Sequence, residues 1–468
     1  MKNPFFYLLL TLCLGFVTPS QAQQKITGNL VNGGFVFPDF VLSQDGKTVV
    51  YRAEQDTDDV VELYVVPANG ATNPVKISGN IPLNADIGTG FILTKDAQKV
   101  FFSADITTDE SYAIYVVPSD GSTAPVKLTP NLVTGGSVVD FILSEDEKTI
   151  IYRADQEEDS KFELYTLAAD GSTPANKING SLVLGGDVSA NYLISKDGKR
   201  IIYHADQDSN DIFELYSVLT DGSSAAIKIS GNLVFNGDVN PLAFILSKDG
   251  KKVLYHADQD LDDKNELYST SVDGSTTPIK VNAPFADDKD VALYAILTKD
   301  GTKAFYLANT DSNGFDLYSI VIGDASSLTK LSISNPNQSI YTPFDLIADE
   351  SRVIFHRTTE SNDLELCTVL TDGSSSPSQL NPNLLSERLI RQYHVTEDGK
   401  RVIYRSDQAT QNTYELYAVP SDASSLPIKI SGDLVTGGSV IQNFTASKNG
   451  DVVIYHADQD TDQVFELY

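Results

Sequence analysis

Cysteine is almost absent from this sequence of 468 residues, which contains only two, Cys13 and Cys367. Cys13 lies in an N-terminal apolar run that we expect to be removed, so one thiol would remain. A single thiol cannot form an intrachain disulfide or a cysteine-ligated metal site. Because Cys367 stands at an apolar position of a repeat, we expect it to be a buried small hydrophobic residue.

Long apolar runs are lacking after the first 22 residues. Met1 and Lys2 precede an apolar run from Pro4 to Val17, and Ser20-Gln21-Ala22 follows it. This order is typical of a signal peptide, which we place at residues 1–22; the alternative is an N-terminal membrane anchor, which the short run disfavours. No later run is long enough to cross a bilayer. We therefore predict an exported protein, periplasmic or extracellular, without membrane insertion after cleavage.

Positive charge is scarce in the chain. The sequence has 34 Lys and Arg against 64 Asp and Glu, which gives a formal net charge of −30 at pH 7. Such a field repels nucleic acid and attracts cations or basic surfaces. The predicted partner is therefore a protein or polymer with basic patches and not a nucleic acid, and we expect the protein to be a monomer.

Helical periodicity is also missing, and a short motif recurs in its place. Glu-Leu-Tyr or a looser version of it occurs nine times at intervals of 49 to 52 residues. The last residues of the copies are Tyr64, Tyr115, Tyr165, Tyr216, Tyr268, Tyr318, Cys367, Tyr417 and Tyr468. A regular period of this length indicates a propeller or a solenoid.

Each repeat reads as four short strands. Runs rich in Val, Ile, Leu, Tyr and Phe are separated by turn residues, including Asp249-Gly250 between the first and second strands and Asp273-Gly274 between the third and fourth. The prediction is an all-β fold, a single β-propeller of nine four-stranded antiparallel blades over residues 23–468. Because propellers usually have four to eight blades, the alternatives are a fragment and two repeats packed outside the ring.

The two ends of the repeat array complement each other. Lys25-Ile26-Thr27-Gly28-Asn29-Leu30-Val31 matches Lys228-Ile229-Ser230-Gly231-Asn232-Leu233-Val234, which includes the fourth strand of a repeat. Tyr468 ends a third strand. We therefore predict that the N-terminal strand completes the last blade and closes the ring.

Two segments resemble the TolB-type propeller repeat, a WD-repeat-like unit. They are Ser247-Lys-Asp-Gly-Lys-Lys-Val-Leu-Tyr255 and Asp458-Gln-Asp-Thr-Asp-Gln-Val-Phe-Glu-Leu-Tyr468. The resemblance implies a propeller. It does not single out a function, since such propellers serve as periplasmic scaffolds, as gating domains of prolyl-oligopeptidase-like enzymes and as some polysaccharide lyases. This chain has Lys, Gln or Glu where the family has a turn proline, and nine units where TolB-like propellers have about six.

Acidic loops join the second and third strands, with oxygen-bearing side chains at positions one, three, five and nine. The five full matches are Glu54, Asp56, Asp58, Glu62; Asp155, Glu157, Asp159, Glu163; Asp206, Asp208, Asn210, Glu214; Asp258, Asp260, Asp262, Glu266; and Asp458, Asp460, Asp462, Glu466. Calcium takes six to eight such oxygens, and the spacing resembles the calcium loops of integrin-type propellers. The alternative is a set of solvated turns, which the missing glycine at position six favours.

A basic residue recurs after the aromatic residue of the second strand. Its members are Arg52, Arg153, His204, His256, His356, Arg405 and His456. They would form either a ring of bases around a channel or structural pairs with the acid two residues on or with a neighbouring blade. The interchange of Arg and His favours pairing. No motif for a hydrolase nucleophile, a catalytic metal or a phosphate loop occurs, so we predict no catalytic residue.

These observations predict an exported, non-catalytic scaffold that binds its partner through the acidic loop face. One alternative is an enzyme acting on polysaccharide, a lyase or a hydrolase, at the channel face. The other is a calcium-stabilised surface adhesion module.

Overall fold

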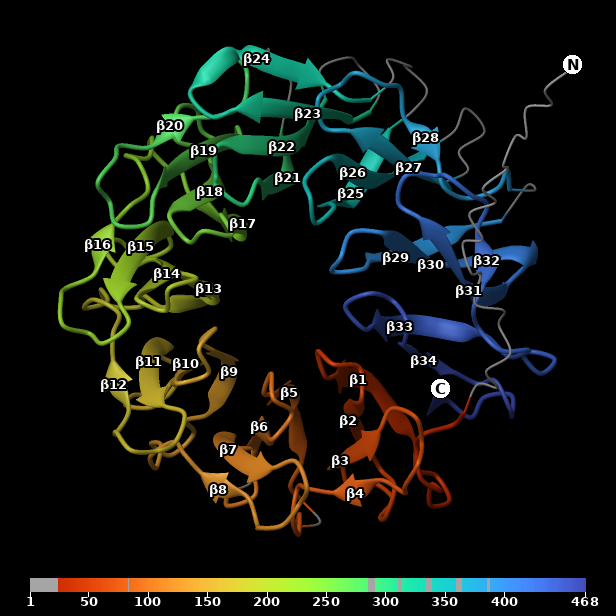
Figure 1. Ribbon diagram of the computed structural model, residues 1–468. Helices are drawn as coiled ribbons and strands as arrows, with labels where there is room; N and C mark the ends of the chain where they lie inside the picture. Colours follow the sequence, from red (N-terminus) through yellow and green to blue (C-terminus); the bar gives the residue numbers. More distant parts are fainter. Residues whose placement is uncertain are drawn as a thin grey trace, which may run out of the picture.

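The computed structural model describes residues 24–82, 84–108, 110–284, 291–309, 314–332, 339–358, 364–384 and 388–468. The predicted signal peptide, residues 1–22, lies outside these ranges. Nine sheets follow one another around a ring, which confirms the predicted nine-bladed β-propeller (Figure 1). Blade 1 contains β1 to β4, blades 2 to 8 each take the next four strands in order, and blade 9 contains β33 to β35.

Each blade is an antiparallel meander that starts at the centre of the ring (Figure 1). The innermost strands are β1 (Val36–Leu42), β5 (Ile87–Leu93), β9 (Val138–Leu143), β13 (Val188–Ile194), β17 (Val239–Leu246), β21 (Val291–Leu297), β25 (Ile340–Leu346), β29 (Ile390–Val395) and β33 (Val440–Ala446). The second strands are β2 (Thr48–Ala53), β6 (Lys99–Ala104), β10 (Thr149–Ala154), β14 (Arg200–Ala205), β18 (Lys252–Ala257), β22 (Lys303–Ala308), β26 (Arg352–Thr358), β30 (Arg401–Thr410) and β34 (Val453–Ala457).

The third and fourth strands form the outer part of each blade. The third strands are β3 (Glu62–Pro67), β7 (Ala113–Pro118), β11 (Glu163–Ala168), β15 (Glu214–Leu219), β19 (Glu266–Ser271), β23 (Asp316–Val321), β27 (Leu364–Leu370), β31 (Thr413–Pro420) and β35 (Glu466–Leu467). The fourth strands are β4 (Val75–Lys76), β8 (Val126–Lys127), β12 (Asn176–Lys177), β16 (Ile227–Lys228), β20 (Ile279–Lys280), β24 (Asp324–Lys330), β28 (Ser378–Gln379) and β32 (Ile428–Lys429).

The N-terminal segment closes the ring as predicted. β33, β34 and β35 form a three-stranded sheet, and the Ile26 amide donates to the Leu467 carbonyl oxygen at 3.0 Å. The equivalent bond in blade 4 joins the Ile229 amide to the Leu215 carbonyl oxygen at 2.8 Å. Residues next to Ile26 therefore occupy the place of the fourth strand of blade 9.

The core lies between the blades. Val49 and Tyr51 of blade 1 pack with Ile454 and Leu467 of blade 9, and each of the other seams holds a similar cluster of buried residues. Burial of these apolar surfaces is the main force that keeps neighbouring blades together. Cys367 is fully buried in one such cluster, and burial raises the pKa of its thiol to about 12.

Turn glycines occupy the positions that the sequence indicates. Gly250 has φ of 73° and Gly274 has φ of 69°, a region that side chains with a Cβ disfavour. In the first turn, the Ser247 hydroxyl and the Lys251 amide both donate to Asp249 Oδ1. The Asp-Gly pairs thus form the hairpin turns of the blades.

Candidate functional site

In four of the five predicted calcium loops, the first acid caps backbone amides. Asp155 is buried, and its Oδ1 accepts a hydrogen bond from the Ser137 amide at 2.6 Å while its Oδ2 accepts one from the Ser160 amide at 3.0 Å. Asp206, Asp258 and Asp458 make the same pair of contacts. These bonds tie each acidic loop to the crossing that enters the same blade, so both lie on one face of the ring.

The third and ninth positions share a lysine from the fourth strand. Lys76 Nζ lies 3.1 Å from Asp56 and 2.8 Å from buried Glu62. Lys177 pairs in the same way with Glu157 and Glu163, Lys228 with Asp208 and Glu214, and Lys280 with Asp260 and Glu266. In blade 9, Lys25 takes this place beside Glu466 at 2.9 Å. A cation of the protein therefore already neutralises these carboxylates.

The fifth position stays exposed in all five loops. It is occupied by Asp58, Asp159, Asn210, Asp262 or Asp462. Within the described residues, carboxylate oxygens come together only at Glu54, Asp58 and Asp59, which lie within 4.8 Å of one another. The structure does not bring positions one, three, five and nine of a loop to one point. Calcium binding by these loops stays a prediction.

Removal of one shared lysine tests the role of these pairs. We expect Lys228→Met to lower the free energy of unfolding by about 1–3 kcal/mol, because buried Glu214 loses its charged partner. Lys199→Met is the matched control, since that lysine is 76% exposed and lies 3.9 Å from Asp197. Thermal and urea unfolding measure both variants, and equal shifts would contradict the structural role of the pair.

Three of the seven recurring basic residues link neighbouring blades. Arg52 Nη1 donates to the Ile87 carbonyl oxygen at 2.8 Å, and Arg405 Nε donates to the Val440 carbonyl oxygen at 2.6 Å. His204 Nε2 contacts the Val239 carbonyl oxygen at 2.8 Å. Each bond reaches the inner strand of the next blade. These contacts match the predicted pairing with a neighbouring blade.

The acid that pairs with the arginines is not the one that the sequence indicated. Arg52 binds Asp39, thirteen residues before it, and Arg153 binds Asp140 in the same way. Both acids lie on the inner strand of the same blade. The carboxylate two residues on is instead the loop cap described above.

One position of the inner strand is polar in three consecutive blades and apolar in the other six. This position, fixed by its pairing with the second strand, is apolar in blades 1 to 6, where it is Val41, Ile92, Ile142, Leu193, Ile245 or Ile296. These side chains pack into the core shared with the next blade. In blades 7 to 9 the same position is Asp345, His394 or Thr445. We call these three residues the polar stripe.

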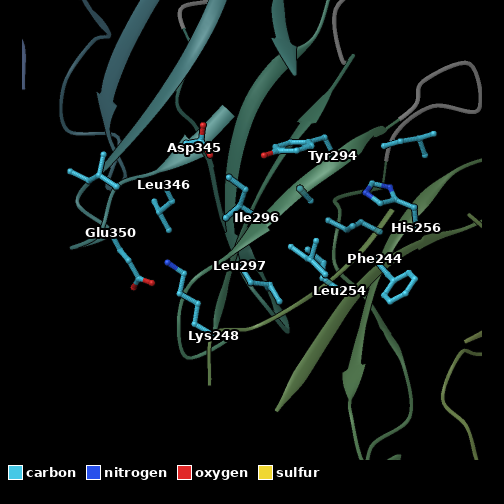
Figure 2. Close-up of a pocket in the computed structure, with 15 residues that line it drawn as sticks. Phe244, Lys248, Leu254, His256, Tyr294, Ile296, Leu297, Asp345, Leu346 and Glu350 are labelled. Carbon is cyan, nitrogen blue, oxygen red and sulfur yellow. The ribbon is translucent and has the colours of Figure 1, made fainter. Parts of the chain in front are cut away.

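Asp345 is only partly exposed, and its surroundings change its acidity. Burial raises the pKa of its carboxyl above the usual range, while a hydrogen bond from Tyr393 and the nearby His394 act in the opposite direction. Figure 2 shows the Tyr294 hydroxyl pointing toward Asp345. Burial, and then the charge of Asp345, raise the pKa of Tyr294 to about 12. Burial therefore favours the neutral form of Asp345 relative to an exposed aspartate.

His394 has the opposite tendency. Burial lowers the pKa of its imidazole, and the charges of Asp345 and Glu397 only partly offset this effect. In the polar stripe, the Asp345 carboxyl therefore lies near the His394 imidazole, and burial favours the neutral form of both groups. A pair of titratable groups shifted in this way is typical of functional sites.

A central cavity of about 560 Å³ adjoins two residues of the polar stripe, His394 and Thr445, whereas Asp345 lines a different cavity. Inner strands of blades 7, 8, 9, 1 and 2 line it, so it lies on the inner wall of the ring. His394 and Thr445 are among the lining residues, together with exposed Arg391 and with Asp39, which pairs with Arg52. Arg391 Nε donates to the Tyr414 hydroxyl at 3.2 Å. Sequence motifs did not indicate this site, because it differs from the rest of the repeat only by polar residues at one inner-strand position that is apolar in blades 1 to 6.

Comparisons with known proteins show a similar fold in solved structures. No family model and no curated protein matches the chain. One matched structure is a prolyl endopeptidase, with 11% identity and a TM-score of 0.45 over 78% of this chain and 53% of that chain. Another is a puromycin-hydrolysing peptidase of Mycobacterium tuberculosis, with 13% identity and a TM-score of 0.42 over 79% of this chain and 59% of that chain. This chain thus spans little more than half the length of either peptidase.

The sequence-based function requires a correction. Both matched structures are of peptidases, whereas the sequence predicted a non-catalytic scaffold that binds through its acidic loop face. The acidic loops also use most of their carboxylates for contacts within the chain. We withdraw that prediction and its two alternatives, the polysaccharide enzyme and the calcium-stabilised adhesion module. At these identities, the similarity itself shows the fold alone.

No helix in the described part of the chain has the length and apolar character needed to cross a bilayer. Export, the absence of a nucleic-acid partner and the monomeric state stay predictions, as does the TolB-type family.

Proposed function

We propose that the protein is an enzyme that binds an extended peptide along the inner wall of the ring and hydrolyses it at the polar stripe. The observation that carries this proposal is the replacement of an apolar wall position by Asp345, His394 and Thr445 in consecutive blades. Apolar residues at this position stabilise the seam in the other blades. A partly buried carboxyl at such a place is a cost to stability that function can explain.

The free edges of the inner strands, rather than the similarity to peptidases, indicate the substrate class. Each inner strand lies at the end of its sheet and pairs only with the second strand. Its other edge presents backbone amides and carbonyl groups that an extended peptide can pair with. Pro343 limits such pairing on β25, whereas β29, which carries Arg391 and His394, contains no proline. We therefore place the peptide along β29.

The two titratable groups supply complementary proton transfers. In the proposed reaction, neutral His394 takes a proton from a water molecule whose oxygen attacks the peptide carbonyl carbon. Protonated Asp345 donates its proton to the leaving amine as the carbon–nitrogen bond breaks. One water is consumed, and a carboxyl and an amine are formed. Arg391 supplies a positive charge that can bind a carboxylate or carbonyl oxygen of the peptide.

Peptide cleavage tests this proposal directly. The full chain is incubated with a defined mixture of peptides, and new peptide ends are detected by mass spectrometry. We expect cleavage by the wild-type protein and a loss of at least about 100-fold in the rate with His394→Gln, because the general base is removed. Asp433→Asn, at a fully exposed carboxylate, is the matched control with an unchanged rate. Absence of cleavage by the wild type, or an unchanged rate in His394→Gln, would overturn the proposal.

A further inference from the structure

An aromatic residue of the inner strand is missing in blade 6 alone. The position that pairs with the second-strand aromatic residue is Phe40, Phe91, Phe141, Tyr192, Phe244, Phe344, Tyr393 or Phe444 in the other blades. In blade 6 it is Ala295, opposite Tyr306. Ala295 belongs to the core cluster that joins blades 5 and 6. An aromatic side chain is therefore missing from the seam between blades 5 and 6.

A cavity of about 370 Å³ lies beside Ala295. Figure 2 shows residues that line it. Ala295 lines it together with Phe244, Leu254, Leu267 and Ile296, which make most of its wall apolar. Leu293 also lines the cavity and is 41% exposed, so the cavity reaches the surface of the inner wall. We call it the seam cavity. Its size falls in the range of small-molecule sites, and it is larger than a single water requires.

His256 brings an unpaired polar group to the seam cavity. Its side chain is 98% buried, since its exposed fraction is 2%, and neither ring nitrogen has a hydrogen-bond partner among the described residues. At the same position, His204 binds Ser189 Oγ and the Val239 carbonyl oxygen, whereas His456 also has no partner at either ring nitrogen among the described residues. His256 differs from His456 in that it lines a cavity of this size. A buried polar group without a partner is costly, so its presence beside a cavity points to a ligand.

The aromatic residue of the next blade explains why His256 faces an open space. In the seam between blades 7 and 8, the His356 ring packs edge-on against Tyr393, with 5.0 Å between the ring centres. Tyr393 stands at the register position of Ala295. The aromatic ring of a bound ligand in the seam cavity would thus pack against His256 as Tyr393 packs against His356.

We propose that the seam cavity binds a single aromatic ring that carries a hydroxyl group, a phenol. The apolar wall accommodates the ring, and the hydroxyl binds His256. Burial lowers the pKa of His256 to about 4, so the imidazole is neutral, with one donor and one acceptor nitrogen. A hydroxyl can donate to one or accept from the other, whichever tautomer is present. Lys248, Asp345 and Glu350 also line the cavity.

Phenol chemistry can come from a free small molecule or from a tyrosine side chain of a peptide. The inference does not depend on peptide hydrolysis, because it rests on Ala295, His256 and the seam cavity. Titration of the full chain with p-cresol, followed by calorimetry, tests it. We expect binding by the wild type and an affinity about tenfold higher for p-cresol than for toluene, which lacks the hydrogen bond.

Two variants separate the ring from the hydroxyl. Ala295→Phe fills the cavity, so we expect loss of p-cresol binding and a higher melting temperature. His256→Leu should remove the preference for p-cresol over toluene. Ile279→Phe is the control, because it adds the same ring at a position of blade 5 that is 41% exposed. No p-cresol binding by the wild type, or unchanged binding by Ala295→Phe, would overturn the inference.

Competition identifies the source of the phenol. If N-acetyl-tyrosine amide displaces p-cresol, the site accepts a tyrosine side chain. If it does not, the ligand is a free phenol, and the site is confirmed in either case. Loss of cleavage in His394→Gln with retained p-cresol binding would separate the seam cavity from the proposed peptidase activity.

Discussion

Ile26→Ala should lower the melting temperature more than Ile229→Ala does. Both isoleucines are 3% exposed and donate equivalent backbone hydrogen bonds, the first to Leu467 and the second to Leu215. Removal of a buried isoleucine side chain costs about 2–5 kcal/mol of unfolding free energy through lost contacts and a cavity. Residue 229 stays next to its third strand through a short connection of the chain. Ile26 has no such connection, so its loss also weakens the closure of the ring.

Amide hydrogen exchange distinguishes the two effects. In Ile26→Ala we expect faster exchange at the Tyr468 amide, which donates to the Tyr455 carbonyl oxygen inside blade 9. In Ile229→Ala, exchange in blade 9 should match the wild type. Equal melting temperatures for the two variants together with unchanged exchange at Tyr468 would show that the N-terminal segment does not hold the ring closed.

Asp345→Ile should abolish activity while it stabilises the fold. Isoleucine stands at this position in four other blades, so the new side chain restores an apolar contact with the core of the next seam. Replacement of a partly buried carboxylate by an apolar residue is often stabilising, and we expect a gain of about 1–2 kcal/mol near neutral pH. The Tyr393 hydroxyl keeps the Pro343 and Ile354 carbonyl oxygens as acceptors.

The pH dependence of stability gives a second readout of Asp345. Its pKa is raised in the folded chain, so the native state binds its proton more tightly than the unfolded chain does. The unfolding free energy contributed by this group therefore falls as the pH rises from the usual range of aspartate through the raised value. Asp345→Ile should lack that fall. An unchanged pH profile would mean that the carboxyl is not perturbed by the seam.

Activity should depend on both members of the acid–base pair. Asp345→Asn keeps the shape of the side chain but removes the proton donor, and we expect a loss of about 100-fold or more in the cleavage rate. The proposed reaction requires protonated Asp345 and neutral His394. We therefore expect the rate to fall at low pH, where His394 gains a proton, and at high pH, where Asp345 loses its proton. An optimum above neutrality would contradict these roles.

The repeat pattern predicted the fold because a single four-stranded unit cannot bury the apolar faces of its own sheet and must pack against neighbouring units. The recurring Glu-Leu-Tyr strand and the Asp-Gly turns indicated four strands per unit, and the match between residues 25–31 and 228–234 indicated ring closure. Both expectations are confirmed. The buried tyrosine of this motif stacks on the second-strand aromatic residue in most blades, as Tyr51 and Tyr64 do at 5.6 Å. Such a pair repeats because each blade needs the same core.

The polar stripe and the seam cavity were harder to foresee. The charge of the acidic loops predicted metal ligands, yet Lys76 and its equivalents pair with their carboxylates from a strand about twenty residues away. Asp345, His394 and Ala295 are single residues inside strands, and their meaning depends on the register that places them on the inner wall. Comparison of the inner strands position by position would have marked all three as exceptions to the repeat.

The closure of the ring also bears on the order in which the chain folds. The ion pair between Lys25 and Glu466 joins residues 441 positions apart, whereas the equivalent pair of Lys76 with Glu62 spans 14. For a flexible chain, this difference adds about 3 kcal/mol of loop-closure entropy. During synthesis the first strand leaves the ribosome long before its partner exists. The intervening blades must therefore form first and bring the two ends of the repeat array together. The segment that contains Lys25 is thus synthesised early but is the last to pair with its neighbouring strand.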